Sequence, residues 1–171
     1  MKNGMLLILL LVSGFNLFGQ DHDSIPQTGF SFTIGTKVTI QLIPVDSVNF
    51  NYRILKFEPY HETIDLDNDK KLLSDKIDND KIEFVFSYGK CGKNKKRKDN
   101  DLRIVLVLKS GLNSIIDYKA DIQVPNKEFE STSVVELLPN VKTREFWPYQ
   151  IDVIALHNFQ KRKLNSYHKN E

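Results

Sequence analysis

Most of the chain after residue 29 alternates apolar and polar side chains. Phenylalanine and isoleucine alternate with serine and threonine over residues 30–34, and the same period of two returns at 38–42 and 48–54. This alternation predicts strands with one buried and one solvent-facing side, as in antiparallel sheets. Pro44 ends the second strand, because proline has no amide hydrogen to donate to a ladder.

The second half of the chain repeats the pattern. Period two predicts strands at 82–88, 118–124 and 151–159, and a short apolar run predicts another at 134–138. The stretch 102–108 is apolar on both faces at its centre, so we expect it to be the most interior strand. The core residues predicted for this half are Phe84, Phe86, Ile104, Leu106, Leu108, Ala120, Ile122 and Val153.

The pattern lapses between His61 and Asp80, where the chain is mostly polar. A short helix over 70–76 with Asp69 as its N-cap is one interpretation of this stretch. Twenty residues exceed an ordinary hairpin loop, so we also expect a connection that crosses from one sheet to another.

About eight short strands without a long helix predict an all-β fold. We expect a β-sandwich with immunoglobulin-like or related Greek-key topology, and a closed β-barrel is the alternative. The expected organisation is one domain over residues 20–160 followed by a polar C-terminal tail at 161–171.

Residues 1–19 have the pattern of a secretory signal peptide. Lys2 precedes an apolar run from Met5 to Val12, and small residues up to Gly19 offer a cleavage site. The ending Leu-Phe-Gly-Gln at 17–20 resembles signal peptides of Gram-negative envelope proteins. We therefore expect an exported protein of the periplasm, cell surface or medium. No later apolar stretch approaches 18 residues, which predicts no transmembrane segment in the mature chain.

Composition excludes some classes of protein. With 40% hydrophobic and 27% charged residues, the chain is not of the disordered type. The formal net charge of +2 creates no strong global field. Cys91 is the only cysteine, so no internal disulfide can form and the core itself must provide the stability.

Two acidic stretches invite a metal interpretation. His61-Glu62-Thr63-Ile64-Asp65 resembles the zinc-protease pattern with aspartate in place of the second histidine, but no third ligand is evident. Asp65, Asp67 and Asp69 are spaced like the first ligands of a calcium loop, yet lysines occupy the later ligand positions. In both cases a polar turn is the favoured interpretation, and we predict no cofactor.

Three further features have structural explanations that we prefer. Lysines around Cys91 would stabilise a thiolate, but no histidine lies near it in sequence to act as a base. His157 falls on the expected buried face of the last strand, as a packed or capping residue. Phe146-Trp147-Pro148-Tyr149 is an aromatic stretch suited to recognition or, as we favour, to closing one end of the sandwich.

The strongest local anomaly is a cluster of six cations within nine positions. It consists of Lys90, Lys93, Lys95, Lys96, Arg97 and Lys98, in the loop between two predicted strands. Such a cluster attracts anionic partners, whereas a solvated loop that discourages aggregation is the plainer interpretation. Nucleic acid is a poor fit, because the chain has an export signal and no aromatic residues interleave with the cations for base stacking.

The sequence therefore predicts a non-enzymatic, exported binding or envelope-assembly module. Its expected partner is an anionic envelope polymer, a lipid surface or another protein, contacted through the Lys90–Lys98 loop. The competing hypothesis is a metal-dependent hydrolase that uses the His61 region.

Export predicts that residues 1–19 are removed in the native host. Mass spectrometry of the protein purified from that host should give a chain that begins after Gly19. Recovery of an intact chain with Met1 from the cytoplasm would contradict this prediction.

Overall fold

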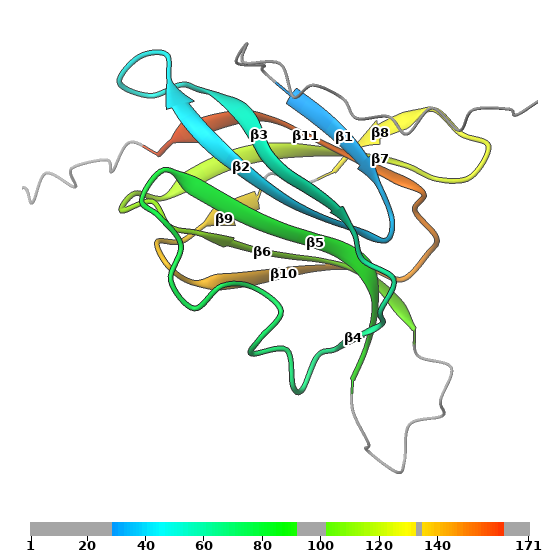
Figure 1. The fold of residues 1–171 in the computed structure, drawn as a ribbon. Helices are drawn as coiled ribbons and strands as arrows, with labels where there is room; N and C mark the ends of the chain where they lie inside the picture. Colours follow the sequence, from blue (N-terminus) through cyan, green and yellow to red (C-terminus); the bar gives the residue numbers. More distant parts are fainter. Residues whose placement is uncertain (1–28, 92–101, 133–134, 163–171) are drawn as a thin grey trace, which may run out of the picture.

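The computed structural model describes residues 29–91, 102–132 and 135–162. Over these ranges the chain forms eleven strands and no helix, in two sheets that pack face to face (Figure 1). The all-β sandwich prediction is confirmed, and the sheets do not close into a barrel. The predicted signal peptide and residues beyond 162 lie outside the described ranges.

Sheet A has the strand order β10-β6-β5-β2-β3. Its strands are β2 (Thr36–Pro44), β3 (Phe50–Pro59), β5 (Lys81–Lys90), β6 (Arg103–Ser110) and β10 (Lys142–Trp147), and the short β4 (Ile64–Asp65) pairs in parallel with the end of β5. Sheet B has the order β1-β11-β7-β8, with β9 also paired to β7. Its strands are β1 (Gly29–Thr33), β7 (Ile116–Gln123), β8 (Phe129–Ser131), β9 (Val135–Leu137) and β11 (Val153–Lys161).

The facing sides of the two sheets form the main core. The alternating apolar residues of β2, β5, β6 and β7 all point into it, which confirms the interior positions predicted for Phe84, Phe86, Ile104, Leu106, Leu108, Ala120 and Ile122. Aromatic rings join the sheets at one end, where Phe159 of β11 packs against Tyr52 of β3 with ring centroids 6.2 Å apart. Such ring pairs contribute beyond the apolar area they bury.

The buried face predicted for β11 is wrong over Val153–His157, although Ile151 and Phe159 of the same predicted face are buried. Ile154 and Leu156 point into the core, whereas Val153 and His157 lie on the outer face of sheet B and are only half-buried. Both faces of this strand are apolar in sequence, so alternation alone does not select one; burying isoleucine and leucine removes more apolar area from water than burying valine and alanine. A bulge between His157 and Gln160 then reverses the alternation and returns Phe159 to the core.

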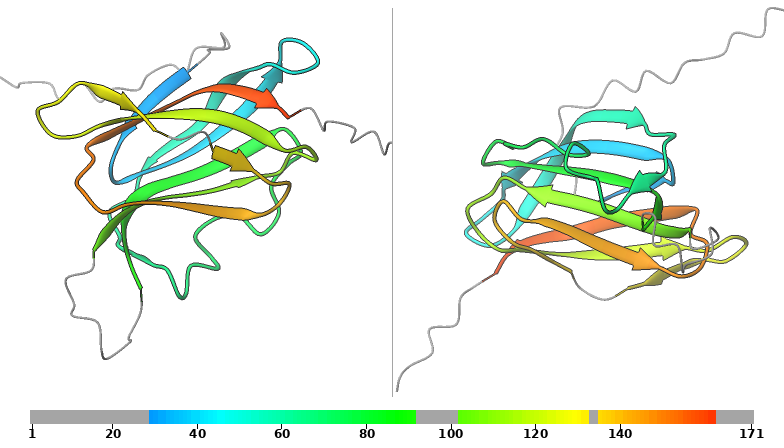
Figure 2. Two further views of the ribbon diagram at one scale, coloured as in Figure 1. Left: turned by 180° about the vertical axis from the view of Figure 1, so that it is seen from behind. Right: turned by 90° about the horizontal axis from the view of Figure 1, so that it is seen from below.

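Residues 60–80, here called the strap, lie over the outer face of sheet A, the face turned away from sheet B (Figure 2). They contain no helix, so the helix expected over 70–76 is wrong. They connect β3 to β5 within one sheet, so the expected crossing between sheets is wrong as well. Ile64, Leu66 and Leu73 of the strap form a second apolar cluster with valines of β5 and β6. The strap thus explains why β6 is apolar on both faces.

The core assignment predicts a large contrast between two single substitutions. Leu106→Ala removes a fully buried side chain and should cost about 2–5 kcal/mol, lowering the Tm by roughly 5–15 °C. Lys119→Ala changes an exposed side chain of β7 and should have little effect on the Tm. Thermal unfolding followed by circular dichroism checks both, and equal losses would contradict the assignment.

Candidate functional site

Polar side chains from neighbouring strands of sheet A hold the strap in place. Lys37 of β2 donates a hydrogen bond to the Leu72 carbonyl (3.0 Å). The Glu83 carboxylate of β5 accepts from both the amide and the hydroxyl of Ser74 (2.9 and 2.6 Å). Lys109 of β6 donates to the Ser74 carbonyl (3.0 Å). These contacts satisfy backbone groups of a segment that has almost no ladder of its own.

Asp69 anchors the strap to the edge strand β10. Its side chain is only 5% exposed and accepts hydrogen bonds from Lys142 Nζ (2.7 Å) and Arg144 Nη2 (2.8 Å). Burial by itself raises the pKa of Asp69, but the hydrogen bonds and charges of the two cations outweigh it and hold the pKa below its ordinary value. Asp69, expected from sequence as a helix cap, is instead the centre of an ionic cluster.

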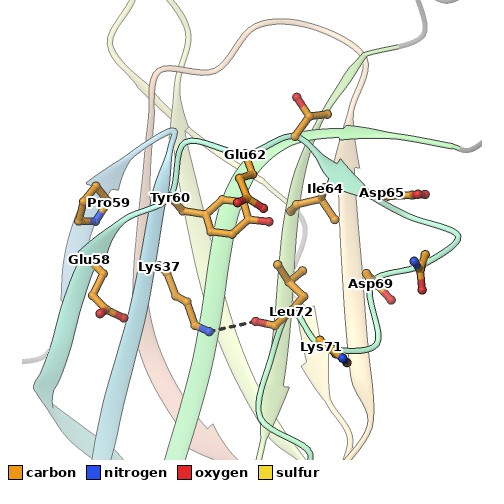
Figure 3. A pocket seen from close by; sticks show the side chains of 12 residues that line it. Lys37, Glu58, Pro59, Tyr60, Glu62, Ile64, Asp65, Asp69, Lys71 and Leu72 are labelled. Carbon is orange, nitrogen blue, oxygen red and sulfur yellow. Dashed lines mark hydrogen bonds between the residues drawn. The ribbon is translucent and has the colours of Figure 1, made fainter.

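An open groove of about 640 Å³ lies between the end of β3 and the strap (Figure 3). The Tyr60 ring lies in its middle, with Lys37 and Glu58 on the strand side and Lys71 on the strap side. Burial and the nearby Glu62 carboxylate both raise the pKa of Tyr60. The volume falls within the usual range for small-molecule sites.

The polar lining of this groove is largely used by the protein itself. The ammonium group of Lys37 is bound to the Leu72 carbonyl, and Glu58 pairs with Lys56 at 2.9 Å. The Asp69 carboxylate is bound to the cations of β10. The groove is therefore the seam along which the strap is attached, and we assign it no ligand.

The two stretches that resemble metal motifs have different surroundings in the structure. Residues 61–65 run from a loop into β4, with His61, Glu62 and Asp65 exposed, so the one-turn helical spacing of a zinc motif is not present there. Within the described ranges, no group of three or more histidine, cysteine or acidic residues is placed to hold a metal ion.

The aspartates at 65, 67 and 69 form a turn. The Asp65 side chain accepts a hydrogen bond from the Asp67 amide (3.2 Å), as is common for aspartate in turns. Asp69 points away into its ionic cluster. The turn interpretation favoured from sequence accounts for this geometry.

The predicted anion-contact loop begins at the end of β5. Lys90 and Cys91 are exposed there, while Lys93, Lys95, Lys96, Arg97 and Lys98 lie outside the described residues. The ladder between β5 and β6 continues to the pair Gly89 and Arg103, so the cationic stretch connects two paired strand ends. The Arg103 side chain is also exposed.

We call this end of sheet A the hairpin end and define it by Tyr88, Lys90, Leu102, Arg103 and Tyr149. Besides the two cations, it carries three exposed apolar side chains. Tyr88 is 41% exposed, Leu102 55% and Tyr149 49%. Their neighbour Trp147 is buried and packs edge-on against Phe86, with ring centroids 6.4 Å apart. The aromatic stretch at 146–149 therefore contributes a core residue and an exposed tyrosine.

Sequence reasoning missed the apolar part of the hairpin end. Tyr88 continues the alternation of Phe84 and Phe86, and Leu102 that of Ile104 and Leu106. The alternation marks these residues as core candidates, but it does not show where sheet B stops covering sheet A.

Glu145 of β10 is a titratable group on the inner side of sheet A. The buried Tyr118 hydroxyl donates a hydrogen bond to its carboxylate (3.1 Å). Burial raises the pKa of Glu145 to about 6 even though this hydrogen bond lowers it. The folded state thus binds a proton more tightly than the unfolded chain, whose carboxyl has the ordinary value of 4.5.

Because of Glu145, the free energy of unfolding should therefore fall as the pH rises from about 4.5 through about 6. Glu145→Gln keeps the shape and an acceptor for Tyr118, so above pH 7 it should stabilise the protein by about 1 kcal/mol, a figure reduced for partial exposure. Urea unfolding at a series of pH values measures this. Glu128→Gln, at an exposed position, is the control and should follow the parent. If the stability of Glu145→Gln fell with pH as steeply as that of the parent, the assignment would be contradicted.

Comparison with known proteins gives no relative for this chain. No protein-family model, curated protein or solved structure matches it. Among the described residues, no helix has the length and apolar character needed to span a membrane.

Proposed function

We propose that this protein is an exported, non-enzymatic binding module that contacts an anionic partner of the cell envelope through the hairpin end. The signal-peptide pattern at 1–19 supports export, and its ending supports a Gram-negative envelope. The observation that carries the proposal is the exposure of Lys90 and Arg103 on the paired strand ends from which the cationic stretch begins and to which it returns.

Two sets of cations in the described part of sheet A differ in what they bind. Lys37, Lys109, Lys142 and Arg144 are bound to carbonyls or carboxylates of the strap and stabilise the fold. Lys90 and Arg103, by contrast, make no side-chain ion pair with any residue of the described ranges. An exposed cation without such a role is available to a partner.

Charge is also concentrated in this part of the chain. Residues 90–103 contain seven cations and only two aspartates, although the chain as a whole carries a net charge of only +2. The field of this cluster extends about 8 Å at physiological ionic strength. An anionic partner would therefore be attracted to this end, and the attraction would weaken as salt is added.

The proposal predicts salt-sensitive binding to a polyanion through the cationic loop. The mature protein should bind heparin at low salt, and its affinity should fall steeply as salt rises. Replacing Lys95, Lys96, Arg97 and Lys98 by serine should reduce low-salt binding at least about tenfold, because four attractive charges are removed. Titration calorimetry at several salt concentrations measures both effects.

A matched control removes the same charge elsewhere. Lys70, Lys76, Lys119 and Lys127 are exposed and lie outside the hairpin end, so their replacement by serine should reduce binding far less. Equal binding by the parent and the loop variant would overturn the proposal. An equal loss of binding in the control variant would also overturn the proposal. So would a parent protein that binds neither heparin nor anionic vesicles.

A further inference from the structure

From the mixture of apolar and cationic side chains at the hairpin end, we infer that the anionic partner is a lipid surface and that Tyr88 and Leu102 enter its interface. This inference rests on the proposed function and names the partner of the same site. It depends on the described residues of the hairpin end, where strand pairing fixes how these side chains are arranged.

Strand register places the two apolar residues on one side of the hairpin. Tyr88 lies opposite Ile104, whose side chain points into the core and is 3% exposed. Cross-strand partners share a face of the sheet, so Tyr88 is on the core-facing side. Leu102 directly precedes β6, two residues before Ile104, and so continues the alternation of that side.

The apolar side of the hairpin therefore extends beyond the sheet that covers it. Phe86 and Leu106, one step further in, are fully buried, whereas Tyr88 and Leu102 are about half exposed. Tyr149, in the connection that leaves β10 after Trp147, adds a third exposed apolar side chain at this end. In Figure 1 the ends of β5 and β6 project from the body of the molecule.

Cations accompany these apolar groups. Lys90 follows Tyr88 on β5 by two residues, and Arg103 is adjacent to Leu102, both exposed. Asp65 lies opposite Lys90 in the β4–β5 pair, but within the described ranges no ion pair joins the two side chains. A tyrosine and a leucine among lysine and arginine match an anionic membrane interface, where aromatic rings lie at headgroup depth and basic residues contact the headgroups.

A soluble polyanion provides no apolar phase, so lipid and polyanion binding should respond differently to apolar substitutions. The Tyr88→Ser, Leu102→Ser double variant should bind vesicles of phosphatidylcholine mixed with phosphatidylglycerol roughly tenfold more weakly than the parent. Its affinity for heparin should be unchanged. Vesicle co-sedimentation measures the first and calorimetry the second, with the Tm confirming that the double variant remains folded.

Val45→Ser is the matched apolar control. Val45 is 60% exposed and lies beyond the opposite end of β2, near the start of β5, so it is far from the hairpin end. This change should leave vesicle binding unaltered. Vesicles of phosphatidylcholine alone should bind the parent weakly, because they lack the negative charge.

A tryptophan probe gives an independent measurement. In Leu102→Trp, the new indole should shift its fluorescence to shorter wavelength when anionic vesicles are added, because it enters the interface. In Val45→Trp no shift should occur. The single native tryptophan, Trp147, is buried and supplies a constant background.

The outcomes separate the lipid inference from the proposed function. Loop-dependent heparin binding together with vesicle binding that ignores the apolar substitutions would overturn the lipid inference and leave the proposed function standing. Loss of self-association in the double variant, without an effect on vesicles, would identify the surface as a contact between copies and also overturn it. Binding of the parent to neither probe would overturn both.

Discussion

The outer face of sheet A is apolar at its centre, and the need to cover that face shapes much of the molecule. Val85, Val105 and Val107 point away from sheet B and would meet water without the strap. Burying them requires an irregular segment to lie on a sheet, which places its backbone groups in a partly dry seam. Several of these backbone groups are hydrogen-bonded by Lys37, Glu83 and Lys109, one on each of three adjacent strands. The strap therefore covers the apolar face and is attached to the same strands by polar contacts.

This arrangement also accounts for the acidic residues whose spacing in sequence resembles a set of metal ligands. Asp69 lies at the far side of the strap from its β3 end, where it meets Lys142 and Arg144 of the edge strand β10. Because both cations compensate one buried carboxylate, an ionic contact joins the edge strand to the strap. The groove beside Tyr60 belongs to the same seam. Folding thus explains both the groove and the acidic cluster, and neither needs a ligand to account for it.

The core residues of a strand could be predicted from sequence where one face of the strand is apolar and the other is polar. Strands β2, β5 and β7 have one apolar face that continues without interruption, and their core residues were predicted correctly. In β11 both faces are apolar, and the bulge at Asn158, with φ of 59°, reverses the phase within the strand. β10 was missed because Lys142, Arg144 and Glu145 make it look like a loop, although two of these bind Asp69 and the third bonds to Tyr118. Such contacts join residues distant in sequence, so local patterns do not reveal them.

The candidate site was predictable in its charge and unpredictable in its apolar part, for the same physical reason. Charge density is a local property, readable as a run of lysines between two strands. Exposure of Tyr88 and Leu102 is a non-local property, set by where the opposing sheet ends relative to the hairpin. In the described structure they lie beside Lys90 and Arg103. The exposed part of these side chains gains no free energy of burial on folding. The exposed apolar groups and the adjacent cations together are the basis on which we propose the hairpin end as a contact surface.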